Sequence, residues 1–335
     1  MQVLLDSDKN FYKANLHCHS TDSDGKLTKE EIKAEFKKRG YSIVAFTDHE
    51  HVLDNSHLDD EDFLAITSCE IAVKEVPTAS TLVNQSMKVT HLNFYALDRH
   101  NCITPCYSSV YDHFKNPMIE DKIRFTEEYQ REYSSKGINE IIETAKKSGF
   151  IVSYNHPIWS NENATDYLNY DGLFAVEIYN HSCNVHGINS HSINVFDDML
   201  RAGKRVYCTM CDDCHFGEPL DSPDSDAFGG WVMINAERLQ YDVIMNALLK
   251  GEFYASTGPT IKSLIRCGEK VIIETSPATQ IAYSTGGRRC AALNAKVGET
   301  VSRAEFTVDK NDRYFRISVK DKNGNFAYTQ GYEVI

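Results

Sequence analysis

The chain has 335 residues, of which 41% are hydrophobic, and it carries a net charge of −13 at pH 7. This length predicts about two domains with a substantial core, and the acidic balance argues against a long nucleic acid as partner, because such partners bind basic surfaces. No apolar run approaches the ~18 residues of a membrane span, and residues 1–10 lack the basic and apolar regions of a signal peptide. We therefore expect a cytoplasmic protein without membrane contact.

The ten cysteines are expected to be free thiols, because disulfide frameworks belong to small secreted domains. The spacing of Cys208, Cys211 and Cys214 also occurs among iron–sulfur ligands. However, Cys208 and Cys211 fall on opposite faces of one predicted strand, which disfavours a shared cluster.

Polar residues follow the first two predicted strands. The first strand ends in His-Cys-His, so that His17 and His19 point to one face and can bind one metal ion. Asp24 follows in a turn. A predicted helix over residues 28–39 leads to the second strand, which ends at His49. A barrel of strands and helices builds an active site at one rim in this way.

The same arrangement recurs further along the chain. Predicted strands that begin near residues 63, 88, 150 and 205 each lead to a histidine or a carboxylate. The resulting candidate metal ligands are six imidazoles and three carboxylates: His17, His19, Asp24, His49, Glu70, His91, His156, Asp213 and His215.

In chain order the motifs are H-x-H, D-G, T-D-H, E, H, N-H-P and D-x-H, an order that resembles the polymerase-and-histidinol-phosphatase (PHP) family of metal-dependent phosphoesterases. The resemblance covers roughly residues 12–250. Asp212 stands where relatives usually carry a small residue, so that either it or Asp213 supplies the last aspartate ligand. Residues 251–259 resemble the exit of a two-domain subgroup with a C-terminal β domain, which includes CehA/McbA-type metallohydrolases.

The resemblance implies an α/β fold, a distorted (β/α)7 TIM-like barrel followed by a small antiparallel β-sandwich. We expect the barrel over residues 1–256, with an irregular and helical insertion at 98–137 over its rim, its helical part at 119–133. The period-two pattern of residues 257–335 independently favours the sandwich, and no histidine occurs there. Helices in the barrel are predicted near 28–39, 138–148, 190–202 and 238–249, each followed by a stop glycine.

The resemblance also implies a trinuclear centre that holds two to three divalent or trivalent ions of zinc, iron or manganese. Glu70 bridges two ions in this scheme, and Glu70 and Asp213 are the catalytic carboxylates. The implied reaction is hydrolysis of a small phosphorylated substrate, a phosphomonoester or nucleotide-like phosphodiester, by a metal-bridging hydroxide. The implied ligand sets are His17, His19, Glu70 and Asp213 for the first ion, Glu70, His91 and His156 for the second, and Asp24, His49 and His215 for the third.

Four residues outside the ligand set are candidates for other roles. His181 follows a predicted strand at the same rim and is either a general acid or a polar loop residue. Lys122 and Arg124 in the insertion are either solvated or in contact with a substrate phosphate. Trp231 either stacks on a nucleobase or packs against the rim.

Two other function classes remain as alternatives. An amidohydrolase-type hydrolase of carbamates, esters or amides also uses H-x-H on a barrel, but its carboxylated lysine would stand where this chain has His91. Some PHP-like relatives of the two-domain type nevertheless cleave carbamates. A non-catalytic metal- or phosphate-sensing module is the other alternative, and the complete ligand set argues against it.

Overall fold

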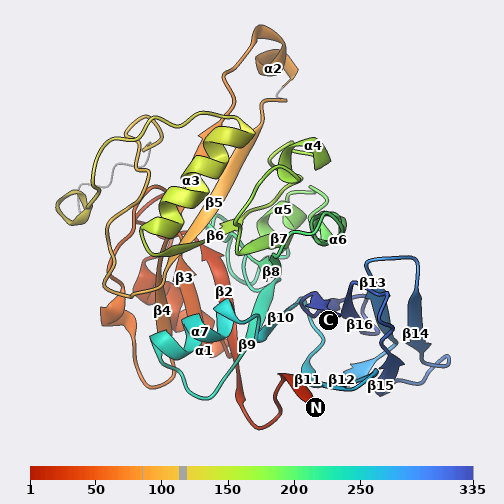
Figure 1. Cartoon of the computed structure of the whole chain (residues 1–335). Coiled ribbons are helices and arrows are strands. Elements are labelled where there is room, and N and C mark those ends of the chain that lie inside the picture. The colour runs from red at the N-terminus through yellow and green to blue at the C-terminus, as the bar shows by residue number, and fades with distance from the viewer. Residues whose placement is uncertain (85, 113–118, 335) are drawn as a thin grey trace. The chain divides into compact units, whose positions relative to one another are not determined.

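The computed structural model describes residues 1–84, 86–112 and 119–334. It divides into two compact units, which are Ala14–Gly230 and the pair of segments Met1–Lys13 and Trp231–Ile335. The sequence pattern changes at residue 257, whereas the contacts divide the chain after Gly230. The two divisions differ because residues 231–256 make strands that pair inside the second unit (Figure 1).

The unit Ala14–Gly230 is built on a mixed sheet whose strand order follows the chain. The first three strands are parallel to one another, and so are the last three, whereas β5 runs antiparallel to both of its neighbours. In the described residues these strands are β2 (Asn10–Cys18, entering from the other unit), β3 (Ile43–Phe46), β4 (Leu64–Lys74), β5 (Val89–Ala96), β6 (Phe150–Tyr154), β7 (Ala175–Asn180) and β8 (Tyr207–Cys211).

The mixed α/β class predicted from the sequence is confirmed, and closure of the strands into a barrel stays a prediction. Just after β8 the chain meets the end of β2 through a single parallel bridge between Cys18 and Cys214. The His19 N–H donates to the Cys214 carbonyl at 3.0 Å, and the Asp213 N–H donates to the His17 carbonyl at 3.0 Å. These bonds hold two ligand-bearing segments side by side.

The four predicted helices are present as α1, α3, α6 and α7. Thr28 and Glu31 form the expected capping box of α1. On α3, Ile138, Ile141 and Ile142 are buried at helical spacing, and α3 packs on β6. The helices and short turns are α1 (Lys29–Lys38), η1 (Ser56–Leu58), α2 (Ala79–Asn84), η2 (Glu120–Lys122), α3 (Ser135–Lys147), α4 (Ala164–Tyr167), α5 (His181–Val185), α6 (Ile193–Arg201) and α7 (Tyr241–Leu249).

The helix expected over residues 119–133 is wrong. Within the described part of the insertion, only the single turn η2 is helical there, and residues 113–118 lie outside the described residues. The backbone pairs with an earlier segment instead: Tyr129 N–H donates to Tyr107 O at 2.8 Å, and Thr104 N–H donates to Arg124 O at 2.8 Å. Long-range pairing therefore outweighs local helix propensity in this segment.

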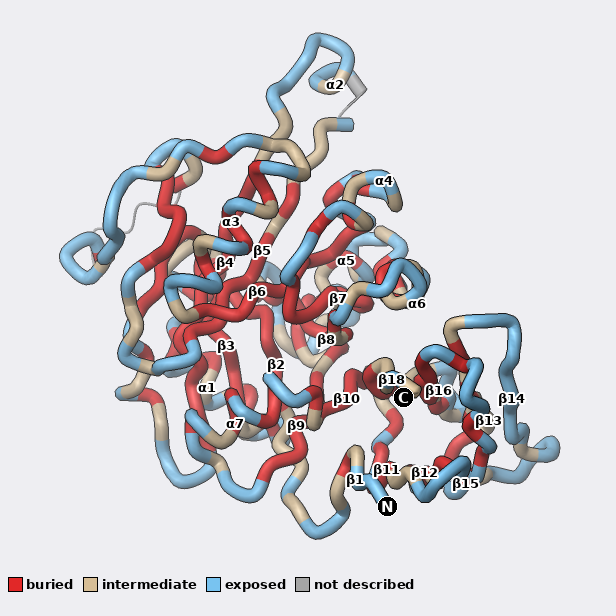
Figure 2. The backbone as a smooth tube through the Cα atoms, viewed as in Figure 1, coloured by how far each residue is buried: buried red, intermediate tan, exposed pale blue. Residues whose placement is uncertain are grey.

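The second unit has two antiparallel sheets that share one hydrophobic core, as expected for a sandwich. Leu5 and Leu264 of one sheet and Ile281 and Phe315 of the other are fully buried in this core, and Figure 2 shows the buried positions in red. The strands are β1 (Gln2–Leu5), β9 (Trp231–Ala236), β10 (Phe253–Ser256), β11 (Ile261–Cys267), β12 (Lys270–Ala278), β13 (Gln280–Thr285), β14 (Cys290–Asn294), β15 (Val301–Thr307), β16 (Tyr314–Lys320), β17 (Phe326–Tyr328) and β18 (Tyr332–Glu333).

All ten cysteines are free, as expected. None of the helices in the described residues combines the length and the apolar character needed to span a bilayer.

Candidate metal centre

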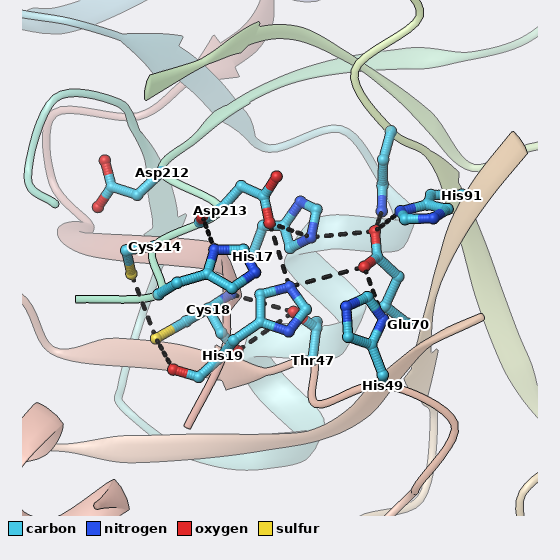
Figure 3. Close-up of polar contacts among 12 residues, drawn as sticks. His17, Cys18, His19, Thr47, His49, Glu70, His91, Asp212, Asp213 and Cys214 are labelled. Atoms are coloured by element: carbon cyan, nitrogen blue, oxygen red, sulfur yellow. Dashed lines mark hydrogen bonds and ion pairs between the residues drawn. The ribbon is translucent and has the colours of Figure 1, made fainter. Parts of the chain in front are cut away.

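The predicted ligands meet at one edge of the mixed sheet. Figure 3 labels part of the set: His17, His19, His49, Glu70, His91 and Asp213. His17 and His19 alternate on β2 and its extension and are completely buried. His17 Nε2 lies 3.0 Å from Asp213 Oδ1, and His19 Nε2 lies 3.1 Å from the same oxygen. Asp24 Oδ2 lies 3.6 Å from both His49 Nε2 and His215 Nε2. Residues separated by almost 200 positions in the sequence therefore form one polar cluster.

Glu70 lies at the centre of this cluster. Its Oε1 is 3.1 Å from His17 Nε2 and 3.2 Å from His91 Nδ1, and its Oε2 is 3.2 Å from His49 Nδ1. His156 Nε2 is 3.5 Å from Oε1. One carboxylate thus faces imidazoles from four segments, which is the arrangement expected of a bridging ligand.

Burial and the neighbouring charges shift the pKa values of both Glu70 and His91. Burial alone would raise the pKa of Glu70, but the imidazoles of His91 and His17 hold it well below its usual range. Burial lowers the pKa of His91 to about 4, although Glu70 acts in the opposite direction. Despite burial, the neighbouring carboxylates raise the pKa of His17, His49 and His156, so metal ions would compete with protons for these imidazoles.

The ligand side chains are held by buried partners. Glu177 accepts a hydrogen bond from His17 Nδ1 at 3.0 Å and another from the His156 N–H at 2.9 Å. Asn155 Nδ2 donates to Glu70 Oε1 at 2.7 Å. With Nδ1 directed at Glu177, Nε2 is the nitrogen of His17 that faces the cluster.

The structure distinguishes the two adjacent aspartates. Asp213 points its carboxylate at His17 and His19, whereas Asp212 points away from them (Figure 3). Asp212 accepts three backbone N–H bonds, from Phe228, Gly229 and Gly230, each at 2.9 Å. Burial raises the pKa of Asp212 to about 7 despite these bonds. Asp213 is therefore the aspartate available to a metal ion.

Backbone strain is concentrated at this edge of the sheet. His156 and Asp213 adopt positive φ angles of 27° and 57°, and Glu50, next to His49, has φ 66°. Such conformations are costly for residues with a Cβ and persist only where the surroundings enforce them. The strain directs these side chains, and the Glu50 N–H donates to the Glu70 carbonyl at 2.8 Å.

The residues present fit metal ions. Buried nitrogens His17 Nε2 and His19 Nδ1 have no partner with hydrogen-bond geometry in the described residues, which is costly unless another ligand satisfies them. All members are nitrogen or oxygen donors, which suit zinc, iron or manganese. Among the described residues, three groups have ligand atoms within 4.8 Å of one another: His19 with Asp24, His49 and His215; His17 with Glu70 and His156; and His17 with His19 and Asp213.

A cavity of about 590 Å³ opens over the cluster. Its lining includes seven of the nine proposed ligands, while His17 and His19 lie beneath them. Glu50 also lines the cavity, and Arg131 of the insertion binds it with Nη1 at 2.7 Å and Nη2 at 2.5 Å from its carboxylate oxygens. Arg131 is buried in this ion pair rather than solvated.

The insertion residues predicted to contact substrate lie elsewhere. Lys122 and Arg124 line a separate cavity of about 460 Å³ together with Lys29 and His57. Arg124 donates to the backbone carbonyls of its own turn, including that of Asp121. The structure does not bring these two side chains to the ligand cluster, because the expected helix that would have carried them is absent.

His181 follows β7 (Ala175–Asn180), as expected, and Trp231 lies on β9. His181 begins α5, and its Nδ1 is 2.9 Å from the Tyr179 hydroxyl. It packs so closely against Gly229 that a Cβ there would lie 2.0 Å from Nδ1. Trp231 belongs to the other compact unit, where Lys13 Nζ lies 4.0 Å from its ring. These contacts give both side chains a packing role.

Sequence reasoning missed two residues. Glu177 is a carboxylate in an otherwise apolar predicted strand, and that pattern could have marked it as a buried partner. Trp159 follows the N-H-P motif by two residues, and its ring lies 5.0 Å from His91 and 4.8 Å from His156, between centroids.

Comparisons with known proteins find similarity in solved structures alone. No family model matches the sequence, and no curated protein matches it. A two-domain protein from Bacteroides vulgatus, described as containing a predicted PHP-like metal-dependent phosphoesterase, is 15% identical with a TM-score of 0.45, covering 99% of this chain and 98% of that chain.

Two further solved structures are similar over the same share of the chain. A candidate metal-dependent phosphoesterase from Bifidobacterium adolescentis is 15% identical with a TM-score of 0.41, covering 63% of this chain and 91% of that chain. An amidohydrolase from Chromobacterium violaceum with bound sulfate and no metal is 15% identical with a TM-score of 0.37, covering 63% and 93%. At these values the similarities assign neither a family nor an activity to this chain.

Proposed function

We propose that this protein is a metal-dependent hydrolase that cleaves a small phosphorylated substrate, a phosphomonoester or a nucleotide-like phosphodiester. The observation that carries the proposal is the clustering of nine nitrogen and oxygen donors, Glu70 and Asp213 among them, beneath an open cavity. The order of the ligand motifs, which resembles that of the PHP phosphoesterases, supports the same reaction class.

The proposed ligands divide between the metal ions as follows from their contacts. His17, His19, Asp213 and Glu70 would hold one ion, and the remaining histidines with Asp24 and Glu70 would hold one or two more. When bound, such ions supply Lewis-acid activation of water and neutralise charge on phosphoryl oxygens. Glu177 and Asn155 hold His17 and Glu70 in the orientation that this binding requires.

The test combines elemental analysis with turnover. Purified protein is reconstituted with zinc, iron or manganese, its metal content per chain is measured, and phosphate release is followed on a panel of small phosphoesters. We expect two to three bound ions and turnover that chelation abolishes and metal addition restores. Carbamates, carboxylic esters and amides form the matched panel, and turnover confined to them would replace the phosphoesterase proposal with the alternative metallohydrolase.

A further inference from the structure

We propose that Trp159 provides, beside the metal ligands, a stacking surface for a flat aromatic group of the bound molecule. The inference rests on the proposed function, because it specifies which small substrates the cavity selects. It concerns the part of the substrate that does not react.

Trp159 packs against two proposed ligands and remains partly exposed. Its ring packs against the imidazoles of His91 and His156, at centroid distances of 5.0 and 4.8 Å. Nevertheless, 41% of the residue remains exposed, and it lines the cavity. An indole held at the edge of a ligand cluster with part of its surface open is well placed to stack, since aromatic rings gain from offset or edge contact.

Apolar side chains line the same cavity as Trp159. Met87, Val89 and Ile188 are half-buried and line the same cavity, with Tyr111 of the insertion. Methionine adapts its shape to a bound ring. These side chains thus offer contact to a ring-sized apolar group, which a short alkyl group would not fill.

Charge on this side of the cavity is compensated. Two charged side chains outside the proposed ligand set, Glu50 and Lys74, line the cavity. Arg131 pairs with both oxygens of Glu50, and Lys74 Nζ lies 5.7 Å from the centroid of the Tyr111 ring. An anionic ester that enters the cavity therefore meets no unpaired carboxylate at the wall. The cavity thus combines the proposed metal ligands with apolar side chains, and Trp159 lies beside two of those ligands.

Two hydroxamates test the wall without requiring turnover. Benzohydroxamate and acetohydroxamate share a metal-binding head group and differ in a phenyl against a methyl group. Their dissociation constants are measured by calorimetry on metal-loaded, full-length protein. We expect benzohydroxamate to bind about tenfold more tightly in the wild type, the size of one aromatic contact with its buried area.

Substitutions test whether Trp159 causes the preference for benzohydroxamate over acetohydroxamate. W159L should abolish the preference and leave acetohydroxamate binding within about twofold, whereas W159F should retain most of it. The matched control is F125L, which removes another exposed aromatic ring of the same unit, one that stacks on Tyr107. Since the chain has two tryptophans, W231F leaves Trp159 as the sole emitter, and benzohydroxamate should quench it more strongly than acetohydroxamate.

The outcomes separate this inference from the proposed function. Equal affinity for the two hydroxamates, a preference that survives W159L, or failure of both to bind the metal-loaded protein would overturn the stacking surface. A clear preference together with no phosphate release from any ester would support the stacking surface and overturn the phosphoesterase proposal alone. Phosphate release with equal hydroxamate affinities would do the reverse.

Discussion

Two buried glutamates differ in how directly they contact the ligand cluster. Glu70 faces four imidazoles, whereas Glu177 contacts the cluster through His17 and the backbone of His156. Removing the charge of Glu70 takes away a ligand shared by several positions. Removing the charge of Glu177 loosens the orientation of one ligand.

We therefore expect E70Q to lower metal affinity more than E177Q does. E177Q should cost about 10- to 100-fold in metal affinity, the usual effect of an outer partner, and E70Q should cost more. Both changes are nearly isosteric, so circular dichroism should remain that of the wild type. Metal content after dialysis against a competing chelator measures the difference, and near-normal retention in E70Q would exclude Glu70 as a ligand.

The buried pair of Arg131 and Glu50 gives a stability prediction. R131M leaves the Glu50 carboxylate buried without its partner and should destabilise the fold by about 3–5 kcal/mol in urea unfolding. The control R124M removes an exposed guanidinium that contacts backbone carbonyls and should change stability by no more than about 0.5 kcal/mol. The double variant R131M/E50Q should recover a large part of the loss. A single R131M as stable as R124M would contradict the importance of the pair.

At this scale the sequence predicts residue types better than residue contacts. Histidines and carboxylates at strand ends could be found because metal binding restricts them to few chemical types. The sequence pointed to Trp231 and contained no signal for Trp159, whose place in the site depends on its packing against His91 and His156. Glu177 escaped because its role depends on the ring orientation of His17.

At the scale of elements, β4 and β5 show why strand direction matters. Glu70 was expected after a strand but lies inside β4, and His91 lies near the start of β5 rather than at its end. Because β5 is antiparallel to β4, Ala72 pairs with His91, and the start of one strand meets the later part of the other. Both residues therefore reach the same edge of the sheet through an antiparallel strand pair. A parallel barrel has no such pair, so its pattern could not predict this placement.

The loop after Asp212 gives a prediction for one element. At Gly229 a Cβ would lie 2.0 Å from the His181 ring, which its contact with Tyr179 holds in place. G229A should therefore destabilise the protein by about 1–3 kcal/mol through overpacking. G217A is the control, since nothing lies within 4 Å of a Cβ there, and it should be near neutral. Thermal unfolding compares the two, and equal melting temperatures would show that His181 can move aside.

At the scale of the whole molecule, acid should weaken the β unit through Asp312. This buried carboxylate accepts hydrogen bonds from Arg289, from Tyr283 at 2.8 Å and from the Asp309 N–H at 2.8 Å. Burial raises its pKa, but these donors outweigh burial and leave the pKa below its ordinary value. The stabilisation is present above the unfolded pKa of about 3.9 and is lost as pH falls through the lower folded pKa.

The variant D312N should therefore be destabilised by about 2 kcal/mol at pH 7, and the gap to the wild type should shrink as pH falls below about 4. Urea unfolding at pH 7 and pH 3 measures both gaps. D309N is the comparison, because Asp309 contacts Asp312 through its backbone N–H, which that substitution keeps. A gap that is equal at the two pH values would rule out the carboxylate charge as its source.

The β unit is made of two chain segments, Met1–Lys13 and Trp231–Ile335, which precede and follow residues 14–230 in the sequence. Val3 of β1 pairs with Ile265 of β11, and Leu5 lies in the same core as Ile281 and Phe315. During synthesis on the ribosome, β1 therefore has no pairing partner until β11 has been made, whereas residues 14–230 are already available to fold. During that interval β1 is an unpaired strand that can pair with the wrong segment. This risk falls on the β unit and not on Ala14–Gly230, the unit that carries the proposed metal ligands.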